Sequence, residues 1–503
     1  MNRNFRLRSK RTAWWLVAAL AVFTLGGHFL TQGSGALPAH PPDFGPPPAA
    51  GLQGIDFASP GAGSVSFTGK LDRQAVLRGG DGRVKMELVL KAEERRRQGA
   101  DRTPTDFVIV LDRSGSMDGA KIEQARAAVR ELLSQLSADD RFALVAYSSS
   151  AEVAIPLATA TADARQSWRR IVAGIRPGGG TNMSAGLDLA MGVAGGAQMG
   201  RAVRWILISD GLANEGDPSI EGLAQRARRA AACEAVVSTV GVGADFNEFL
   251  MSSVADAGTG NYYFLNDTEQ LAQVFADEFE ATRETVATAV AVTVEPGDGV
   301  RVIDAAGYPL EHAGGKTTFR PGTLFSGQER RVWVTLEVPN HSLGDRSLGT
   351  FSLAYKDSSP GDRGVTRVVR FDDTPVVACV AGETEYHESF DQDTWARSVA
   401  EEDYNGLQQK VASYVKAGQR DKALKEIDDF RSHNQRLNLV MKQEAISRKL
   451  EELHSLKVEV EDAFEGENQG AKQNQLSKTR QYAGRDGRRA GSKKAQSGAK
   501  GGS

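Results

Sequence analysis

Between residues 106 and 282, apolar runs of strand length alternate with amphipathic stretches of helical length. Several of the short runs are apolar at successive positions, which is typical of parallel strands that are covered on both faces. The predicted strands are Phe107–Leu111, Arg141–Ser148, Val203–Ser209, Ala235–Val242 and Asn261–Leu265. The predicted helices are Lys121–Leu136, Thr161–Gly174, Ser184–Val193, Ser219–Cys233, Asn247–Ala257 and Thr268–Glu280. This order predicts a doubly wound, Rossmann-like α/β domain.

The segments on either side of this domain follow a period of two instead. Within residues 64–105 the alternation is clearest at Val84, Met86 and Leu88, and it returns over residues 283–392. Such a pattern predicts the strands of an antiparallel β-sandwich. We therefore expect the α/β domain to be inserted in the sandwich or flanked by it.

The last part of the chain contains two segments with different patterns, one with helical periodicity and one of low complexity. Residues 393–465 carry apolar side chains at helical spacing, as at Leu407, Val411 and Val415, and this spacing predicts a helical hairpin or a short coiled coil. Residues 466–503 are rich in Gly, Gln, Lys, Ser and Arg. We interpret them as a basic, disordered tail.

The N-terminus has the pattern of an export segment. A basic stretch precedes the apolar run Ala13–Leu25, and small residues follow at 34–36. This order predicts a signal peptide within residues 1–36, with an uncleaved membrane anchor over residues 13–30 as the alternative. Both predict an extracytoplasmic protein, whether periplasmic, on the cell surface or secreted. The Pro- and Gly-rich residues 37–63 then form a linker.

Composition narrows the class of protein. The 503 residues are 40% hydrophobic and 25% charged, which excludes a wholly disordered chain. The net charge is −3, but the first 36 residues carry five basic side chains and residues 466–503 carry a net +7, so the remaining body is −15. An acidic body argues against nucleic acid as a partner and is compatible with cations.

Two cysteines, Cys233 and Cys379, lie in different predicted domains. Neither has another Cys or a His at ligand spacing, which argues against a metal or redox pair. We expect two buried free thiols, and a single disulfide remains the alternative in an oxidising compartment.

Three predicted loops bring oxygen donors to one edge of the predicted sheet. The first strand of the α/β domain ends in Asp112-Arg113-Ser114-Gly115-Ser116, a Gly-rich turn ends in Thr181, and another buried strand is followed by Asp210. Ligands bind at the carboxyl edge of such sheets. Carboxylate and hydroxyl oxygens suit a hard cation such as Mg²⁺. The candidate metal ligands are Asp112, Ser114, Ser116, Thr181 and Asp210.

This set of residues resembles the metal-ion-dependent adhesion site of von Willebrand factor type A (VWA) domains, and the resemblance covers about residues 106–282. It implies that the two serines and the threonine bind the metal directly, and that the two aspartates bind it directly or through water. It also implies that a carboxylate from a protein partner fills the last coordination position. The flanking segments resemble those of exported bacterial proteins. We expect Mg²⁺ as the metal, with Mn²⁺ or Ca²⁺ as alternatives.

The sequence therefore predicts a non-enzymatic, exported protein that captures an acidic side chain of a partner protein through a bound cation. It leaves the oligomeric state open. One alternative is a structural scaffold that acts through its C-terminal helices. Another is a metal-dependent hydrolase with Asp112 or Asp210 as the base, although neither aspartate has a His or Lys nearby in the sequence. A nucleotide-binding loop is excluded, because Gly195–Arg201 lacks the G-K-[ST] ending.

Overall fold

A computed structural model describes residues 56–59, 63–94, 104–194, 201–210, 213–242, 246–265, 285–359, 362 and 364–489. All of them belong to one compact unit, Leu52–Ser503. The predicted export segment, residues 1–36, and the predicted helix Thr268–Glu280 lie outside the described residues. Within the ranges described, no helix is both long and apolar enough to cross a lipid bilayer.

The central domain is built on a six-stranded sheet of order β10-β9-β8-β5-β6-β7. Neighbouring strands are parallel, except that the edge strand β7 runs antiparallel to β6. The strands are β5 (Thr105–Asp112), β6 (Arg141–Tyr147), β7 (Ala151–Thr159), β8 (Ala202–Ser209), β9 (Ala235–Val242) and β10 (Thr259–Leu265). Strand β5 lies inside the sheet and the strand order reverses there, so the prediction of a doubly wound fold is confirmed.

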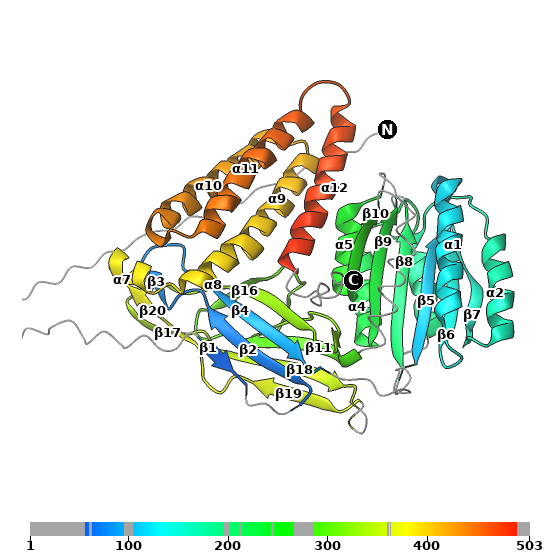
Figure 1. The fold of residues 1–503 in the computed structure, drawn as a ribbon, viewed down its shortest axis with the longest axis horizontal. Coiled ribbons are helices and arrows are strands. Elements are labelled where there is room, and N and C mark those ends of the chain that lie inside the picture. The colour runs from blue at the N-terminus through cyan, green and yellow to red at the C-terminus, as the bar shows by residue number, and fades with distance from the viewer. Residues whose placement is uncertain are drawn as a thin grey trace, which may run out of the picture. The chain divides into compact units, whose positions relative to one another are not determined.

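Helices cover both faces of this sheet (Figure 1). They are α1 (Ala120–Gln135), α2 (Ala162–Gly174), α3 (Met183–Ala194), α4 (Ile220–Ala232) and α5 (Glu248–Ala257). Phe107 and Ile109 of β5 belong to the core under α1 and α2, whereas Val108 and Val110 belong to the core under α3, α4 and α5. Because successive strand side chains point to opposite faces, a strand covered twice is apolar at every position.

The edge strand β7 was missing from the sequence prediction. Ile155 is its only buried residue, and the exposed Pro156 follows. A mostly exposed strand gives no clear alternation of apolar and polar residues. Proline is tolerated there because an edge strand leaves some of its backbone N–H groups without a neighbouring strand.

The strands before and after the central domain form two antiparallel sheets with a common core. One has the order β1-β2-β4-β16-β12 and the other β13-β14-β11-β18-β19, with β15 beside β11. Their bounds are β1 (Asp56–Ala58), β2 (Val65–Leu71), β4 (Arg83–Ala92), β11 (Thr285–Glu295), β12 (Arg301–Ala305), β13 (Glu311–Ala313), β14 (Lys316–Phe319), β15 (Leu324–Phe325), β16 (Glu329–Glu337), β18 (Thr350–Asp357) and β19 (Thr366–Arg370). Strand β4 precedes the α/β domain in the sequence, and β16 follows that domain. The two strands pair with each other along the length of β4. The α/β domain is therefore an insertion in the sandwich.

Two details of the sandwich differ from the sequence prediction. Strand β1 lies within residues 37–63, so the linker prediction is wrong at residues 56–58, where Phe57 is buried and β1 pairs with β2. A small third sheet also joins β17 (Gly344–Ser347), β20 (Val376–Val380) and β3 (Ala75–Leu77).

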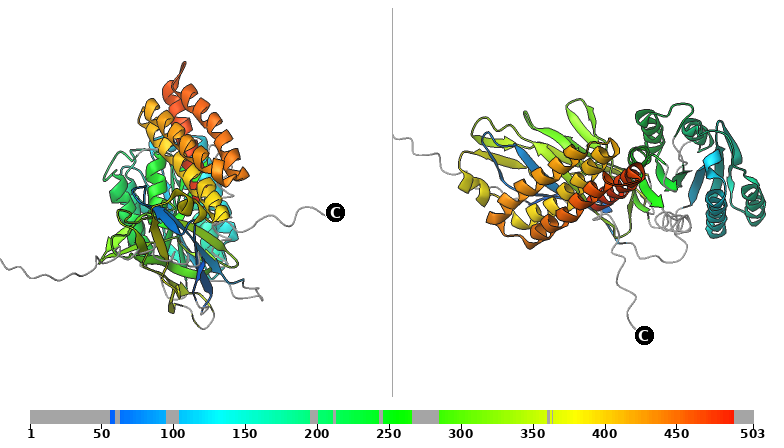
Figure 2. Two further views of the ribbon diagram at one scale, coloured as in Figure 1. Left: turned by 90° about the vertical axis from the view of Figure 1, so that its left-hand side faces the viewer. Right: turned by 90° about the horizontal axis from the view of Figure 1, so that it is seen from above.

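The C-terminal part is helical, as predicted, but it contains more helices than a hairpin. They are α7 (Glu383–Glu388), α8 (Gln392–Arg397), a π-helical segment (Ser398–Asp403), α9 (Tyr404–Lys416), α10 (Arg420–Met441), α11 (Glu444–Ala463) and α12 (Gln469–Arg488). Helix α9 packs against α10 and α12, and α11 against the same two helices (Figures 1 and 2). The prediction of a disordered tail is therefore wrong for residues 469–488. Helix α12 buries polar residues such as Ser477, Lys478 and Gln481, so its buried face leaves no apolar pattern.

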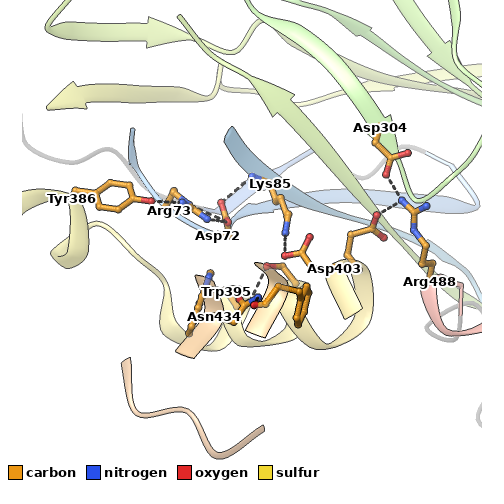
Figure 3. Close-up of polar contacts among 12 residues, drawn as sticks. Asp72, Arg73, Lys85, Asp304, Tyr386, Trp395, Asp403, Asn434 and Arg488 are labelled. Atoms are coloured by element: carbon orange, nitrogen blue, oxygen red, sulfur yellow. Dashed lines mark hydrogen bonds and ion pairs between the residues drawn. The ribbon is translucent and has the colours of Figure 1, made fainter. Parts of the chain in front are cut away.

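Three consecutive acidic residues of the π-helical segment contact the sandwich and helix α12. The contacts are Trp333–Glu401, Arg488–Glu402 and Lys85–Asp403. Arg488 of α12 also contacts Asp304 of β12, so one guanidinium joins a strand and two helical segments (Figure 3). The attachment uses polar and charged groups, which explains why apolar periodicity alone did not reveal it.

Candidate metal centre

The first part of the candidate centre is the end of β5. Asp112 is the last residue of that strand, and its Oδ1 accepts a hydrogen bond of 2.8 Å from the backbone N–H of Ser114. Its Oδ2 accepts a bond of 2.7 Å from the hydroxyl of Ser209, the last residue of β8. Asp112, Ser114 and Ser209 are all buried. The carboxylate is therefore fixed in place by the two strand ends.

Asp210, which follows β8, completes this cluster. Its Oδ1 accepts a hydrogen bond of 2.8 Å from the hydroxyl of Ser116, which lies 94 positions earlier in the chain. The hydroxyl oxygens of Ser114 and Ser116 are 3.1 Å apart. The Asp210 side chain is fully buried, whereas Ser116 is exposed. Two carboxylates and two hydroxyls thus gather at the carboxyl edge of the sheet.

The Gly-rich turn that carries Thr181 is tied to the same loop through the backbone. Gly178 N–H donates to the carbonyl oxygen of Arg113 at 2.8 Å, and Gly115 N–H donates to that of Gly179 at 3.0 Å. Gly179 has a φ of +82°, a conformation that favours glycine. The buried Thr181 follows this turn. Four predicted residues are therefore linked through side-chain contacts, and the turn that precedes the fifth, Thr181, is hydrogen-bonded to the loop that carries Ser114 and Ser116.

Asn214 holds the turn from the other side. The backbone N–H of Thr181 donates to Asn214 Oδ1 at 2.8 Å, and the backbone N–H of Asn214 donates back to the Thr181 carbonyl at 3.1 Å. The sequence interpretation did not include Asn214 or Ser209. Ser209 could have been found, because it is a polar residue at the end of an otherwise apolar strand, directly before Asp210.

The electrostatics of the cluster are those of a buried negative site. Burial raises the pKa of Asp112 above its usual value. Hydrogen bonds from Ser114 and Ser209 partly offset this rise, and the nearby charge of Asp210 adds to it. Burial, with the charge of Asp112 nearby, also raises the pKa of the Tyr147 phenol well above its ordinary value. Two carboxylates in such a place are stabilised by a positive charge.

One positive charge is supplied by the protein itself. The ammonium group of Lys121 forms an ion pair with Asp210 Oδ2 and lies 3.3 Å from the carbonyl oxygen of Ser116. Lys121 stands in the first turn of α1, which follows the loop of Ser114 and Ser116. Sequence reasoning found no lysine beside the aspartates, because the contact depends on where the flexible stem of Lys121 reaches.

The donor chemistry fits a hard divalent cation. All five candidate side chains offer oxygen, which Mg²⁺, Mn²⁺ and Ca²⁺ prefer. In the described part of the chain, no group of three or more His, Cys, Asp or Glu side chains is placed to hold a metal ion. Cys233 and Cys379 are both free thiols; Cys379 is buried as predicted, but the prediction of burial is wrong for Cys233, which is exposed at the end of α4. The cluster at the ends of β5 and β8 is therefore the best candidate that the described residues offer.

The fold and this cluster define a doubly wound α/β domain whose chemistry lies at the carboxyl ends of its strands. Residues 106–277 match the von Willebrand factor type A domain family, and this segment is therefore a VWA domain. A von Willebrand factor type A protein from Catenulispora acidiphila has a similar structure, with a TM-score of 0.59 over 82% of this chain and 93% of its own, at 16% identity.

Two further proteins are similar over most of their own length. The ArnB paralog VWA2 from Sulfolobus acidocaldarius gives a TM-score of 0.52 over 86% of this chain and 100% of its own, at 17% identity. The uncharacterized protein sll0103 from Synechocystis is 22% identical over 61% of this chain and 72% of its own length. At these identities the two solved structures show the fold and not the activity.

Proposed function

We propose that this protein is an exported, non-enzymatic binding protein whose VWA domain captures an acidic side chain of a partner protein through a bound Mg²⁺. The observation that carries the proposal is the contact between Ser116 and Asp210, 2.8 Å long and bridging 94 positions of sequence. It brings a candidate ligand from the loop after β5 together with the candidate ligand that follows β8. VWA domains mediate protein–protein interactions, which supports a partner rather than a small substrate.

The proposed roles follow from the geometry of the chain. Asp112, Ser114, Ser116, Thr181 and Asp210 would hold the cation, which when bound offers a Lewis-acidic position to one more oxygen. Burial and the two serine hydrogen bonds fix the orientation of Asp112. The exposed Ser116 places the cluster within reach of the surface. We propose an extracytoplasmic location, with residues 13–30 as the candidate anchor if the N-terminal segment is retained.

The test compares immobilised wild-type and variant proteins as baits for envelope extract, in Mg²⁺ and in chelator. We expect Asp112→Ala and Ser114→Ala to lose both the Mg²⁺-dependent capture and the heat of Mg²⁺ binding in calorimetry. Ser134→Ala is the matched control, because Ser134 is exposed on α1 and bonds only within its own helix. Equal capture by the wild type in Mg²⁺ and in chelator would refute the proposal.

One observation favours a second candidate, a scaffold that acts through its C-terminal helices. Leu439 and Val440, near the end of α10, are 73% and 54% exposed, which is unusual for two neighbouring large apolar residues. The double substitution Leu439→Ser and Val440→Ser separates the two functions. Loss of capture in this variant, together with full capture by Asp112→Ala, would favour the scaffold over the metal centre.

A further inference from the structure

The ammonium group of Lys121 lies on the carboxylate that the proposed metal would use. It pairs with Asp210 Oδ2, while Ser116 donates to Oδ1 of the same carboxylate. The Asp210 side chain is fully buried, whereas 27% of the Lys121 side chain is exposed. The lysine therefore reaches the centre from its solvent side and places a positive charge beside the ligand oxygens.

A divalent cation at these oxygens meets this charge directly. Two positive charges a few ångströms apart repel each other, and a partly buried site screens that repulsion less than water does. The four-carbon stem of lysine is flexible and its ammonium group is readily hydrated. Lys121 is thus able to leave Asp210 for solvent, but only by giving up its ion pair.

We propose that Lys121 is a built-in competitor of the metal, which neutralises Asp210 in the absence of a cation and thereby lowers the apparent affinity of the centre. The inference rests on the proposed function, because it concerns the same cation and the same ligands. Lys121 would thus set the affinity for Mg²⁺ without being one of the five metal ligands. Its consequence is a centre that fills at a higher free Mg²⁺ concentration than its oxygen donors alone would require.

The decisive variant is Lys121→Met, which keeps the apolar stem and removes the charge. We expect its dissociation constant for Mg²⁺, measured by calorimetry and by displacement of Mn²⁺, to be about tenfold tighter than that of the wild type, or about 1.4 kcal/mol. In chelator the same variant should have a lower midpoint of thermal unfolding, because Asp210 is left buried without a counter-charge. In saturating Mg²⁺ the two midpoints should converge, because the wild type must also give up the Lys121–Asp210 ion pair when the cation binds.

Two further variants serve as controls. Lys316→Met makes the same charge change on β14, where Lys316 is 51% exposed and pairs with Glu295, and it should change neither measurement. Lys121→Gln, whose side chain ends in an uncharged polar amide, should reproduce the tighter binding and so exclude an effect of the methionine side chain.

The outcomes separate the inference from the function on which it rests. If Lys121→Met binds Mg²⁺ no more tightly than the wild type, while Ser114→Ala loses binding, the competitor role is wrong and the metal centre stands. If neither the wild type nor Lys121→Met binds Mg²⁺, the proposed function itself fails and the inference fails with it.

Discussion

Removing Arg485 should loosen the last helix from the VWA domain. Arg485 of α12 and Arg489, directly after that helix, both contact Asp256 in α5, with N–O distances of 2.9 Å and 2.6 Å. The three side chains are only 9%, 13% and 14% exposed, respectively. Burial alone would raise the pKa of Asp256, but the charges of the two arginines hold it below its usual value. The three side chains therefore form a buried ionic contact between parts of the chain far apart in sequence, with two positive charges on one carboxylate.

The magnitude follows from what Arg485→Met leaves behind. Removing one partner of a buried ion pair typically costs about 3–5 kcal/mol, because the other charge stays buried without a partner. Here Arg489 remains on the same carboxylate oxygen, so Asp256 keeps a counter-charge. We therefore expect a loss of about 2 kcal/mol in the free energy of opening α12. That loss corresponds to about 30-fold faster amide exchange where exchange occurs through local opening.

Hydrogen exchange followed by mass spectrometry measures this quantity on peptides from residues 469–488 of the full-length protein. Arg448→Met is the control, since Arg448 pairs with Glu444 at the surface of α11, where the two side chains are 69% and 80% exposed. Such a surface pair is worth about 0–1 kcal/mol, and its loss should leave α12 unaffected. An exchange rate within about twofold of the wild type in Arg485→Met would refute the reasoning, because α12 would then not depend on this contact.

Three further measurements test other parts of the structure. Because burial raises the pKa of Asp112, its charged form destabilises the fold at neutral pH, so Asp112→Asn should raise the thermal midpoint in chelator and abolish any Mg²⁺-induced rise. The lowered pKa of Asp256 means that its ionised carboxylate stabilises the folded state above the unfolded-state pKa. This stabilisation is lost as the pH falls through the lower pKa of the folded state. Amide exchange in residues 469–488, corrected for intrinsic rates, should therefore accelerate only below about pH 4. Gly179→Ala should weaken Mg²⁺ binding several-fold, because an alanine is strained at a φ of +82°. Gly174→Ala is the control and should leave Mg²⁺ binding unchanged, because the space around Gly174 is open. Equal effects of the two substitutions would exclude a role for the turn in Mg²⁺ binding.

The buried strands of the VWA domain could be predicted from sequence because each is covered on two faces. Ala235–Val242 is buried at all of its positions, and its predicted bounds match those of β9. The same reasoning placed Asp112 and Asp210 at one sheet edge, since strand direction fixes where each strand ends. It failed for β7, where Ile155 alone is buried and no pattern marks the strand.

The contacts of long charged side chains could not be predicted in this way. Lys121 was identified only as the start of a helix, and its pairing with Asp210 depends on the path of a flexible stem across 89 positions of sequence. Helix α12 was hidden for a related reason. Its buried positions include Ser477, which donates to Glu248 of α5 at 2.8 Å, and a helix that buries polar groups with partners carries no apolar stripe.

The uneven charge of the chain has a structural explanation in these contacts. A basic C-terminal segment beside an acidic body is typical of a solvated tail or of a surface that binds anions. Here, however, Arg485 and Arg489 meet Asp256, and Arg488 meets Glu402, all within the same chain. Each arginine that is paired internally is desolvated and already bound to a carboxylate, so it is withdrawn from external anions. The basic part of α12 therefore serves first to join the VWA domain and the sandwich to the helices, and the acidic body supplies its complement.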